Sequence, residues 1–575
     1  MGSSGTPHQT RLMEGRVDVR EPRRTEPEEI VRERALVELV TSRRDCATVD
    51  QEPGDRAGRR PDHGKGAPGA GIDIGGQDPL ELWRERVHGL GERRFEERRI
   101  EVGCDRHRAA AQPFGHQPLE RRRELRGDLG ESRLVVGESR LGGHKRNTTV
   151  TRVTLVLTDA DQAKLAGHEG EAQALAMRIV TGLAETMGAS ALLSIEGAHI
   201  DSCLYHGRSG IDFAERLVDG GARVAVPTTL NVSSLDLLHP DLYQGPRDEA
   251  AAARRLMTLY ETMGCEPTWT CAPYQLEVRP HFGQHVAWAE SNAIVFANSV
   301  LGARTHRYGD FIDICAAITG RAPAAGLHLD ENRRGQVLFR LVGLRDELLD
   351  HDVLAPVLGY LIGEATGDLV PVIEGLRPET PEHRLKALGS AAASSGAVGI
   401  FHAVGVTPEA STLAEAMGRR EPLRTVEVGP ADLRRARDEL TSTRTASASL
   451  GAVSLGTPHY SVTEFGRLVD LLDGRSIDPD VKFFVNTGRD VWHEVRLRGW
   501  ADRLEAAGVR VVTDTCTYIT PVMGDIHGFA LTDSAKWAHY APGNLGIEVA
   551  FGSVDDCVES AVAGRLVRHD ELWGG

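Results

Sequence analysis

Apolar positions recur at helical spacing near residue 160 and again in short blocks near the C-terminus. Thr158 and Asp161 have the spacing of a helix capping box, and apolar residues that could form one helix face follow at Leu165, Ala172, Leu175, Ile179 and Leu183. The apolar block 222–227 is typical of a buried strand that enters a polar loop. These patterns predict a helix from residue 159 and a strand at 222–227.

The C-terminal part alternates apolar blocks with amphipathic segments. The blocks predict strands at 452–455, 482–485 and 509–512, and the segments predict helices at 461–473 and 489–507. Short strand–helix–strand connections favour right-handed crossovers and a parallel sheet, so we expect an α/β subdomain around 450–520. Ligands bind at the carboxyl ends of strands in such sheets, here 456–459, 486–489 and 514–518.

Residues 1–146 differ from the rest of the chain in composition and in the pattern of apolar residues. They show no sustained period, and 27 of the 29 basic residues among the first 150 are arginine. Few β-branched or aromatic side chains are available to offset the entropy of ordering the backbone. We interpret this segment as a disordered extension or as a translation start placed too far upstream, in preference to a folded domain, and expect the globular region at 147–575.

Charge and hydropathy exclude several classes of protein. The net charge of −16 argues against nucleic acid as the main partner of the globular part. The run 389–406 is too rich in Ala, Gly and Ser to insert stably into a membrane. No N-terminal apolar stretch follows a basic start, so we expect no secretory signal. Eight cysteines in 575 residues are too few for a disulfide framework, so we expect a cytoplasmic protein.

Six cysteines fall in the globular region, and none forms a CxxC pair. Cys315 and Cys557 lie in apolar helical patterns that favour burial in the core, and Cys265 also has a structural setting. Cys203, Cys271 and Cys516, in contrast, lie among polar and turn-forming residues. Thiolates from distant loops could hold an iron centre, although a free cysteine is more often a small buried hydrophobic residue.

Other polar residues indicate a small-molecule site. His199 and His206 flank Cys203 beside Asp201, which favours substrate contact. Lys536 precedes Trp537, where a lysine could lie over the ring, bind a carboxylate or shuttle a proton. No P-loop, HExxH, GxSxG or strand-anchored GxGxxG motif is present, which argues against the corresponding enzyme classes.

Several unusual segments, which follow one another along the chain, resemble aconitase X, and specifically its large catalytic subunit. The segments are 197–210 (GAHIDSCLYHGRSG), 226–236 (VPTTLNVSSLD), 267–275 (PTWTCAPYQ), 288–319, 402–410 (HAVGVTPEA), 454–461 (SLGTPHYS), 514–516 and 534–552 (SAKWAHYAPGNLGIEVAFG). The resemblance implies an iron–sulfur hydro-lyase of the aconitase superfamily, with parallel-sheet α/β domains around a metal site. It also implies a swivelling domain, which we expect as a separate small subunit that carries a catalytic group, expected to be serine.

Two activities occur in the family. Bacterial members dehydrate cis-3-hydroxy-L-proline to Δ1-pyrroline-2-carboxylate, and archaeal members dehydrate (R)-5-phosphomevalonate. The archaeal cluster cysteines would correspond to Cys271, Thr457 and Cys516. The threonine at 457 and the cysteine at 203 favour the bacterial type, with Cys203 as third ligand, Cys315 as the fallback and a [2Fe-2S] cluster; mononuclear iron or [4Fe-4S] is the alternative.

The resemblance also implies roles for the site residues. Lys536 and His199 would handle protons or bind the substrate carboxylate. The residues expected to line the substrate site are Asp201, Ser202, His206, Asn231, Ser233 and Glu290. Phosphomevalonate dehydration is the alternative reaction, and a binding or assembly subunit without turnover is the alternative of another class.

Overall fold

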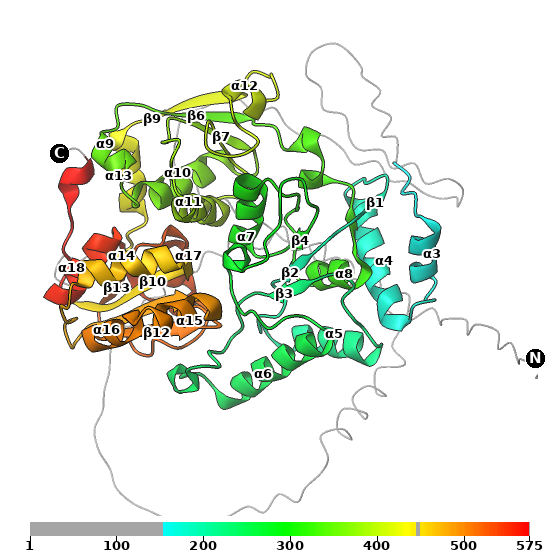
Figure 1. Ribbon diagram of the computed structural model, residues 1–575, viewed down its shortest axis with the longest axis horizontal. Helices are drawn as coiled ribbons and strands as arrows, with labels where there is room; N and C mark the ends of the chain where they lie inside the picture. Colours follow the sequence, from blue (N-terminus) through cyan, green and yellow to red (C-terminus); the bar gives the residue numbers. More distant parts are fainter. Residues whose placement is uncertain (1–152, 444–448, 574–575) are drawn as a thin grey trace, which may run out of the picture. The chain divides into compact units, whose positions relative to one another are not determined.

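Three parallel β-sheets follow one another along the chain in the computed structural model, which describes residues 153–443 and 449–573 (Figure 1). The sequence-based predictions for 1–146 fall outside these residues. The expected parallel-sheet α/β fold is confirmed. None of the described helices is long and apolar enough to cross a membrane.

The first sheet has three parallel strands in the order β3 (Thr228–Leu230), β2 (Ala198–Ile200) and β4 (Ala287–Trp288). A separate antiparallel pair joins β1 (Leu192–Ser194) to β5 (Arg321–Pro323). The helices of this part are α3 (Asp159–Leu165), α4 (Glu171–Thr186), α5 (Arg208–Asp219), α6 (Arg247–Thr262), α7 (Ser291–Phe296) and α8 (Ile312–Thr319).

Two predictions in this part need correction. The Thr158–Asp161 capping box exists, but the helix that it starts ends at Leu165, and α4 begins only at Glu171. Gly170, with a φ of 110°, precedes α4 in a backbone conformation that side chains disfavour. The predicted strand at 222–227 is irregular because the backbone N–H groups of Val224 and Ala225 donate to Met263 and Ala317 and not to a strand; the strand itself begins at Thr228.

The second sheet has four parallel strands in the order β8 (His402–Ala403), β7 (Pro371–Glu374), β6 (Val337–Leu341) and β9 (Arg424–Val428). Its helices are α9 (Asp346–Leu349), α10 (Leu354–Thr366), α11 (Glu382–Ser395), α12 (Leu413–Ala416) and α13 (Pro430–Glu439). The small residues judged too weakly apolar for a membrane span lie partly in α11. A Cβ at Gly359 of α10 would lie 2.2 Å from the Leu388 carbonyl oxygen, so glycine allows α10 and α11 to approach closely.

The third sheet has five parallel strands in the order β12 (Val509–Thr513), β11 (Lys482–Thr487), β10 (Leu450–Tyr460), β13 (Phe529–Thr532) and β14 (Glu548–Phe551). The helices are α14 (Val462–Leu472), α15 (Arg489–Leu497), α16 (Trp500–Ala507), α17 (Ala535–Leu545) and α18 (Val554–Ala563). The parallel arrangement and the Ser461–Glu464 capping box of α14 confirm the sequence predictions. The predicted helix 489–507 is two helices, because Gly499 takes a left-handed conformation between them.

Helix α11 lies where the three sheet-containing parts meet, since it packs against α7 of the first part, α10 of its own and α17 of the third. All three parts can therefore contribute to a site near this helix.

A buried ion pair also joins the first and second parts. The Arg333 guanidinium, 1% exposed, donates to Glu409 at 3.0 Å from Nε, and Arg304 donates to the same carboxylate. The Glu409→Gln variant should lose about 3 kcal/mol of unfolding free energy, because a buried guanidinium loses its charged partner. Chemical denaturation of this variant and of Glu374→Gln, which removes the exposed Arg340–Glu374 pair, checks this. The control should lose under about 1 kcal/mol, and equal losses would contradict the prediction.

Candidate metal centre and active site

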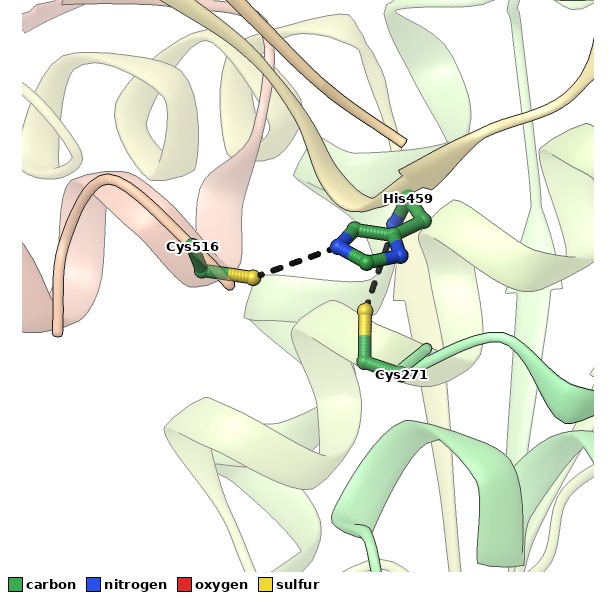
Figure 2. A group of neighbouring side chains, drawn as sticks. All are labelled: Cys271, His459 and Cys516. Carbon is green, nitrogen blue, oxygen red and sulfur yellow. Dashed lines mark hydrogen bonds between the residues drawn. The ribbon is translucent and has the colours of Figure 1, made fainter. Parts of the chain in front are cut away.

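Two cysteines and a histidine from distant segments meet at one buried point (Figure 2). Cys271 lies in the loop before the short helix Pro273–Gln275, His459 near the end of β10, and Cys516 after the carboxyl end of β12. Their ligand atoms all lie within 4.8 Å of one another. The structure therefore brings together two of the three predicted metal-ligating cysteines.

Hydrogen bonds fix the backbone N–H and the ring of His459. Its backbone N–H donates to the Cys271 sulfur at 3.3 Å, and its ring nitrogens contact Thr270 Oγ1 (3.0 Å, Nδ1), the Thr515 carbonyl oxygen (3.2 Å, Nε2) and Cys516 Sγ (3.7 Å, Nε2). Burial lowers the pKa of His459 to about 4, and the Thr515 contact offsets this only in part. The ring is therefore neutral at physiological pH.

Gly456 allows β10 to bring His459 to this position. Its φ is 83°, and a Cβ there would lie 2.2 Å from the Asn486 carbonyl oxygen of β11. The register between β10 and β11 shifts between Leu455 and Tyr460, so the strand leaves the regular ladder just before the histidine. A side chain at position 456 would clash with the β11 backbone.

The donor set fits an iron centre. Thiolates are soft ligands, and imidazole also suits iron. Two thiolates on one tetrahedral ion with metal–sulfur bonds of about 2.3 Å would lie roughly 3.8 Å apart, which is compatible with the proximity of Cys271 and Cys516. The neighbouring Cys271 thiol and burial both hold the pKa of Cys516 well above its usual value, so metal binding must displace a proton.

His199, Asp201 and Asn231 lie together at the carboxyl ends of β2 and β3. His199 is fully buried; its Nδ1 contacts Thr229 Oγ1 at 2.8 Å, and its Nε2 has no partner among the described residues. Burial lowers the pKa of His199 to about 3. The Asn231 amide donates to Asp201. The neutral imidazole thus keeps one ring nitrogen available for a ligand.

Ser202 and Ser233 use their hydroxyl groups within the protein. Ser202 Oγ donates to Asp313 at 2.9 Å and contacts the Tyr260 hydroxyl at 2.7 Å. Ser233 Oγ donates to the Leu235 carbonyl oxygen at 2.9 Å. These contacts indicate that both serines shape the loops around the site.

Lys536, at the start of α17, is paired with Glu290. Nζ lies 2.5 Å from Glu290 Oε1, and both side chains are at least 93% buried. Burial lowers the pKa of Lys536, but the Glu290 carboxylate outweighs it and raises the pKa well above its usual value. Asn292 joins this pair to the metal centre, because its amide donates to Glu290 and, at 2.9 Å, to the Cys271 carbonyl oxygen.

The remaining predicted site residues lie outside the Cys271–His459–Cys516 group. Cys203 donates to the carbonyl oxygens of Ile200 (3.3 Å) and Asn231 (3.5 Å), and its metal-ligating role stays a prediction. His206 is exposed, and its role is likewise undecided. Cys315 is fully buried in the core on α8, as its apolar pattern indicated.

Comparison with known families decides where the chain belongs. Models of the first, second and third domains of aconitase X match residues 154–331, 335–438 and 450–563, in that order. The chain belongs to the aconitase X family. These three matches coincide with the three sheet-containing parts, which are called the first, second and third domains below.

Two aconitase X relatives and one solved structure are particularly informative. The chain is 47% identical over 416 residues to cis-3-hydroxy-L-proline dehydratase of Pseudomonas aeruginosa, which covers 72% of this chain and 71% of that protein. It is 33% identical over 409 residues to the phosphomevalonate dehydratase large subunit of Thermococcus kodakarensis, 71% of this chain and 100% of that protein. The holo-form crystal structure of Thermococcus kodakaraensis aconitase X covers 71% of this chain and all of its own, at 31% identity and a TM-score of 0.64.

These relatives show an enzyme that catalyses dehydration, a hydro-lyase. Membership of aconitase X implies an iron–sulfur cluster, and the cysteine–histidine group is a place for it. His459 was not among the predicted site residues. The available signal was its place in 456–459, a predicted strand end at which ligands bind.

Proposed function

We propose that this chain dehydrates cis-3-hydroxy-L-proline to Δ1-pyrroline-2-carboxylate, together with a small subunit. The observation that carries the proposal is the charge around Asp201. Burial is the largest of the effects that raise the pKa of Asp201 to about 8; Asp310, Glu290 and Asp313 also raise it, and the hydrogen bond from Asn231 lowers it. A carboxyl group surrounded by carboxylates suits a substrate with a cationic nitrogen.

The two candidate substrates differ in this respect. Hydroxyproline carries a secondary ammonium group, which the Asp201 surroundings attract. Phosphomevalonate carries a phosphate and a carboxylate, which the same carboxylates would repel. The 47% identity to a hydroxyproline dehydratase supports the same choice, as does the threonine at 457.

The residues of this chain can be assigned proposed roles. The substrate hydroxyl would lie near His199, whose unpartnered Nε2 can form a hydrogen bond. Lys536 would donate a proton to the departing hydroxyl, because developing hydroxide is a far stronger base than an amine. Glu290 keeps that lysine protonated beforehand. The enamine that results then tautomerises to the cyclic imine.

Cys271 and Cys516 would hold an iron–sulfur cluster, with Cys203 as the proposed third ligand. Bound iron would supply a Lewis acid for the substrate hydroxyl. Cys203 lies outside the close group and would complete the ligand set of a [2Fe-2S] cluster, whereas His459, inside the group, would suit mononuclear iron.

A separate small subunit would complete the enzyme. The chain spans the whole Thermococcus large subunit but only 71% of the Pseudomonas dehydratase. We propose that a second chain supplies a swivelling domain and the catalytic serine, because the Thermococcus relative is named as the large subunit of its enzyme. That subunit would include the group that removes the proton alpha to the carboxylate.

The test is an assay of two substrates with the iron-loaded native protein, purified so that a bound small subunit is retained. We expect pyrroline-2-carboxylate from cis-3-hydroxy-L-proline and no dehydration of (R)-5-phosphomevalonate, because the carboxylates near Asp201 disfavour an anionic substrate. Activity on phosphomevalonate alone would refute the substrate assignment. A native protein that binds no iron, and that dehydrates neither substrate even with its small subunit, would support the binding-subunit alternative.

A further inference from the structure

A polar cavity lies beside Lys536, between α11, the end of β10 and the start of α17. Its volume is about 40 Å³, and its lining includes Ser390, Thr457, Asp533 and Lys536. His199, Asp201 and Glu290 are absent from the lining residues, which distinguishes this space from the proposed substrate site.

Two hydroxyl groups in this lining have no hydrogen-bond partner in the described protein. Ser390 is 2% exposed and Thr457 is 5% exposed, and neither side-chain oxygen is paired. Buried polar groups nearly always have a partner, which is often an ordered water. A water needs about 10–15 Å³ of such space and two to four polar partners, so this cavity can hold about three.

Asp533 lines this inner cavity and also a second cavity, called the outer cavity because its lining includes side chains that are about a fifth to a third exposed. The outer cavity has a volume of about 60 Å³, and its lining also includes Asp352, His383 and Arg467. Asp533 lines both cavities and accepts a hydrogen bond from the Tyr460 hydroxyl.

The charged groups that act on Asp533 come from α11 and α14. The pKa of Asp533 is raised to about 7, chiefly by burial and also by Glu464, while the Tyr460 hydrogen bond and Lys386 act to lower it. Lys386 and Glu464 are themselves paired at 2.6 Å. Asp533 can thus both hold and release a proton near neutral pH.

We propose that ordered water in the inner cavity, bound by Ser390 and Thr457, forms a proton path from Asp533 to Lys536. This path rests on the proposed role of Lys536 as proton donor. After each turnover Lys536 is a neutral amine. A cavity water gives its proton to Nζ and takes one from the Asp533 carboxylic acid, which leaves an ammonium and a carboxylate. Asp533 then regains a proton from solvent through the outer cavity.

The first test is the Asp533→Asn variant, which preserves the side-chain size and the Tyr460 contact but cannot carry the proton. We expect the first turnover per site to proceed at nearly the wild-type rate, because Lys536 already holds its proton. Steady-state kcat should fall by about tenfold or more, with KM changed by less than about twofold. The exposed Asp480→Asn variant removes an equal charge elsewhere and should match wild type. The proposal would be overturned if Asp533→Asn kept the wild-type kcat, or if its first-turnover rate and its steady-state kcat fell by the same factor.

A second test does not depend on turnover. A high-resolution crystal structure of the iron-loaded enzyme should show ordered water on Ser390 Oγ and Thr457 Oγ1, and Ser390→Val should displace it. Infrared titration should show a carboxylic-acid band that is lost near pH 7 and is missing in Asp533→Asn. If wild type fails to dehydrate hydroxyproline yet passes these measurements, the proposed function fails while the hydrated path stands. A cavity without water in the crystal would overturn the path itself.

Discussion

The Lys536→Met variant should dehydrate its substrate about a thousandfold more slowly than the wild-type enzyme. General acid catalysis typically contributes 10²–10⁴ in rate. Methionine has nearly the length of lysine but no proton to donate, and its introduction leaves the Glu290 carboxylate buried without its ammonium partner. The measurement is kcat with iron-loaded protein, together with the free energy of unfolding.

A double variant separates chemistry from stability. Removal of one partner of a buried ion pair typically costs 3–5 kcal/mol, so Lys536→Met alone should also be less stable. Lys536→Met combined with Glu290→Gln removes the stranded charge and should recover much of that stability without recovering activity. Lys164→Met, in α3 of the first domain, serves as a lysine control and should keep wild-type kcat. Recovery of activity in the double variant would contradict the proton-donor role.

The Cys271→Ser and Cys516→Ser variants should each lose bound iron and fall to background activity. Serine has nearly the same size but is a much poorer ligand for iron than a thiolate. Iron content, visible absorption and dehydration rate measure the effect. Cys315 is buried on α8, so Cys315→Ser controls for the loss of a buried thiol, and this variant should keep the wild-type iron content. Full iron content in Cys271→Ser would remove this centre as the metal site.

The same measurement identifies the third ligand. If two irons are bound, Cys203→Ser should lose iron while His459→Asn keeps most of it. The reverse result would place His459 on a single ion. Both side chains are at most 1% exposed, so thermal unfolding of each variant must be compared with that of Cys315→Ser.

Three of the five strands of the third domain could be predicted from the sequence. Its strands are continuous apolar blocks, and the Ser461–Glu464 spacing locates the start of α14, so the local pattern and the tertiary structure agree. The strand-end rule also placed Cys516 at the correct edge of the sheet. The strand at 222–227 was wrong because its backbone bonds to Met263 and Ala317 and not to a neighbouring strand, and apolar content alone does not specify strand pairing.

Other parts of the site depend on contacts between domains, which local patterns do not encode. Lys386 illustrates this: it belongs to a helix of the second domain, yet its ammonium donates to the His459 carbonyl oxygen of the third domain at 3.0 Å. The proximity of His459 to Cys271 depends on the conformation at Gly456, which lets β10 leave its regular register. The sequence context selected Lys536 and the family resemblance added Glu290 to the substrate site, but their pairing is visible only in the structure.

The distribution of these residues over three domains has a consequence for biosynthesis. Cys271 is synthesised 245 residues before Cys516. Strand β10, which carries His459, is held by Lys386 of α11, a helix of the second domain. A ribosome must therefore nearly finish the chain before both thiols can bind the same metal centre. Iron loading becomes a late maturation event, and a nascent or truncated chain would expose its sulfur atoms to oxidants instead of enclosing them.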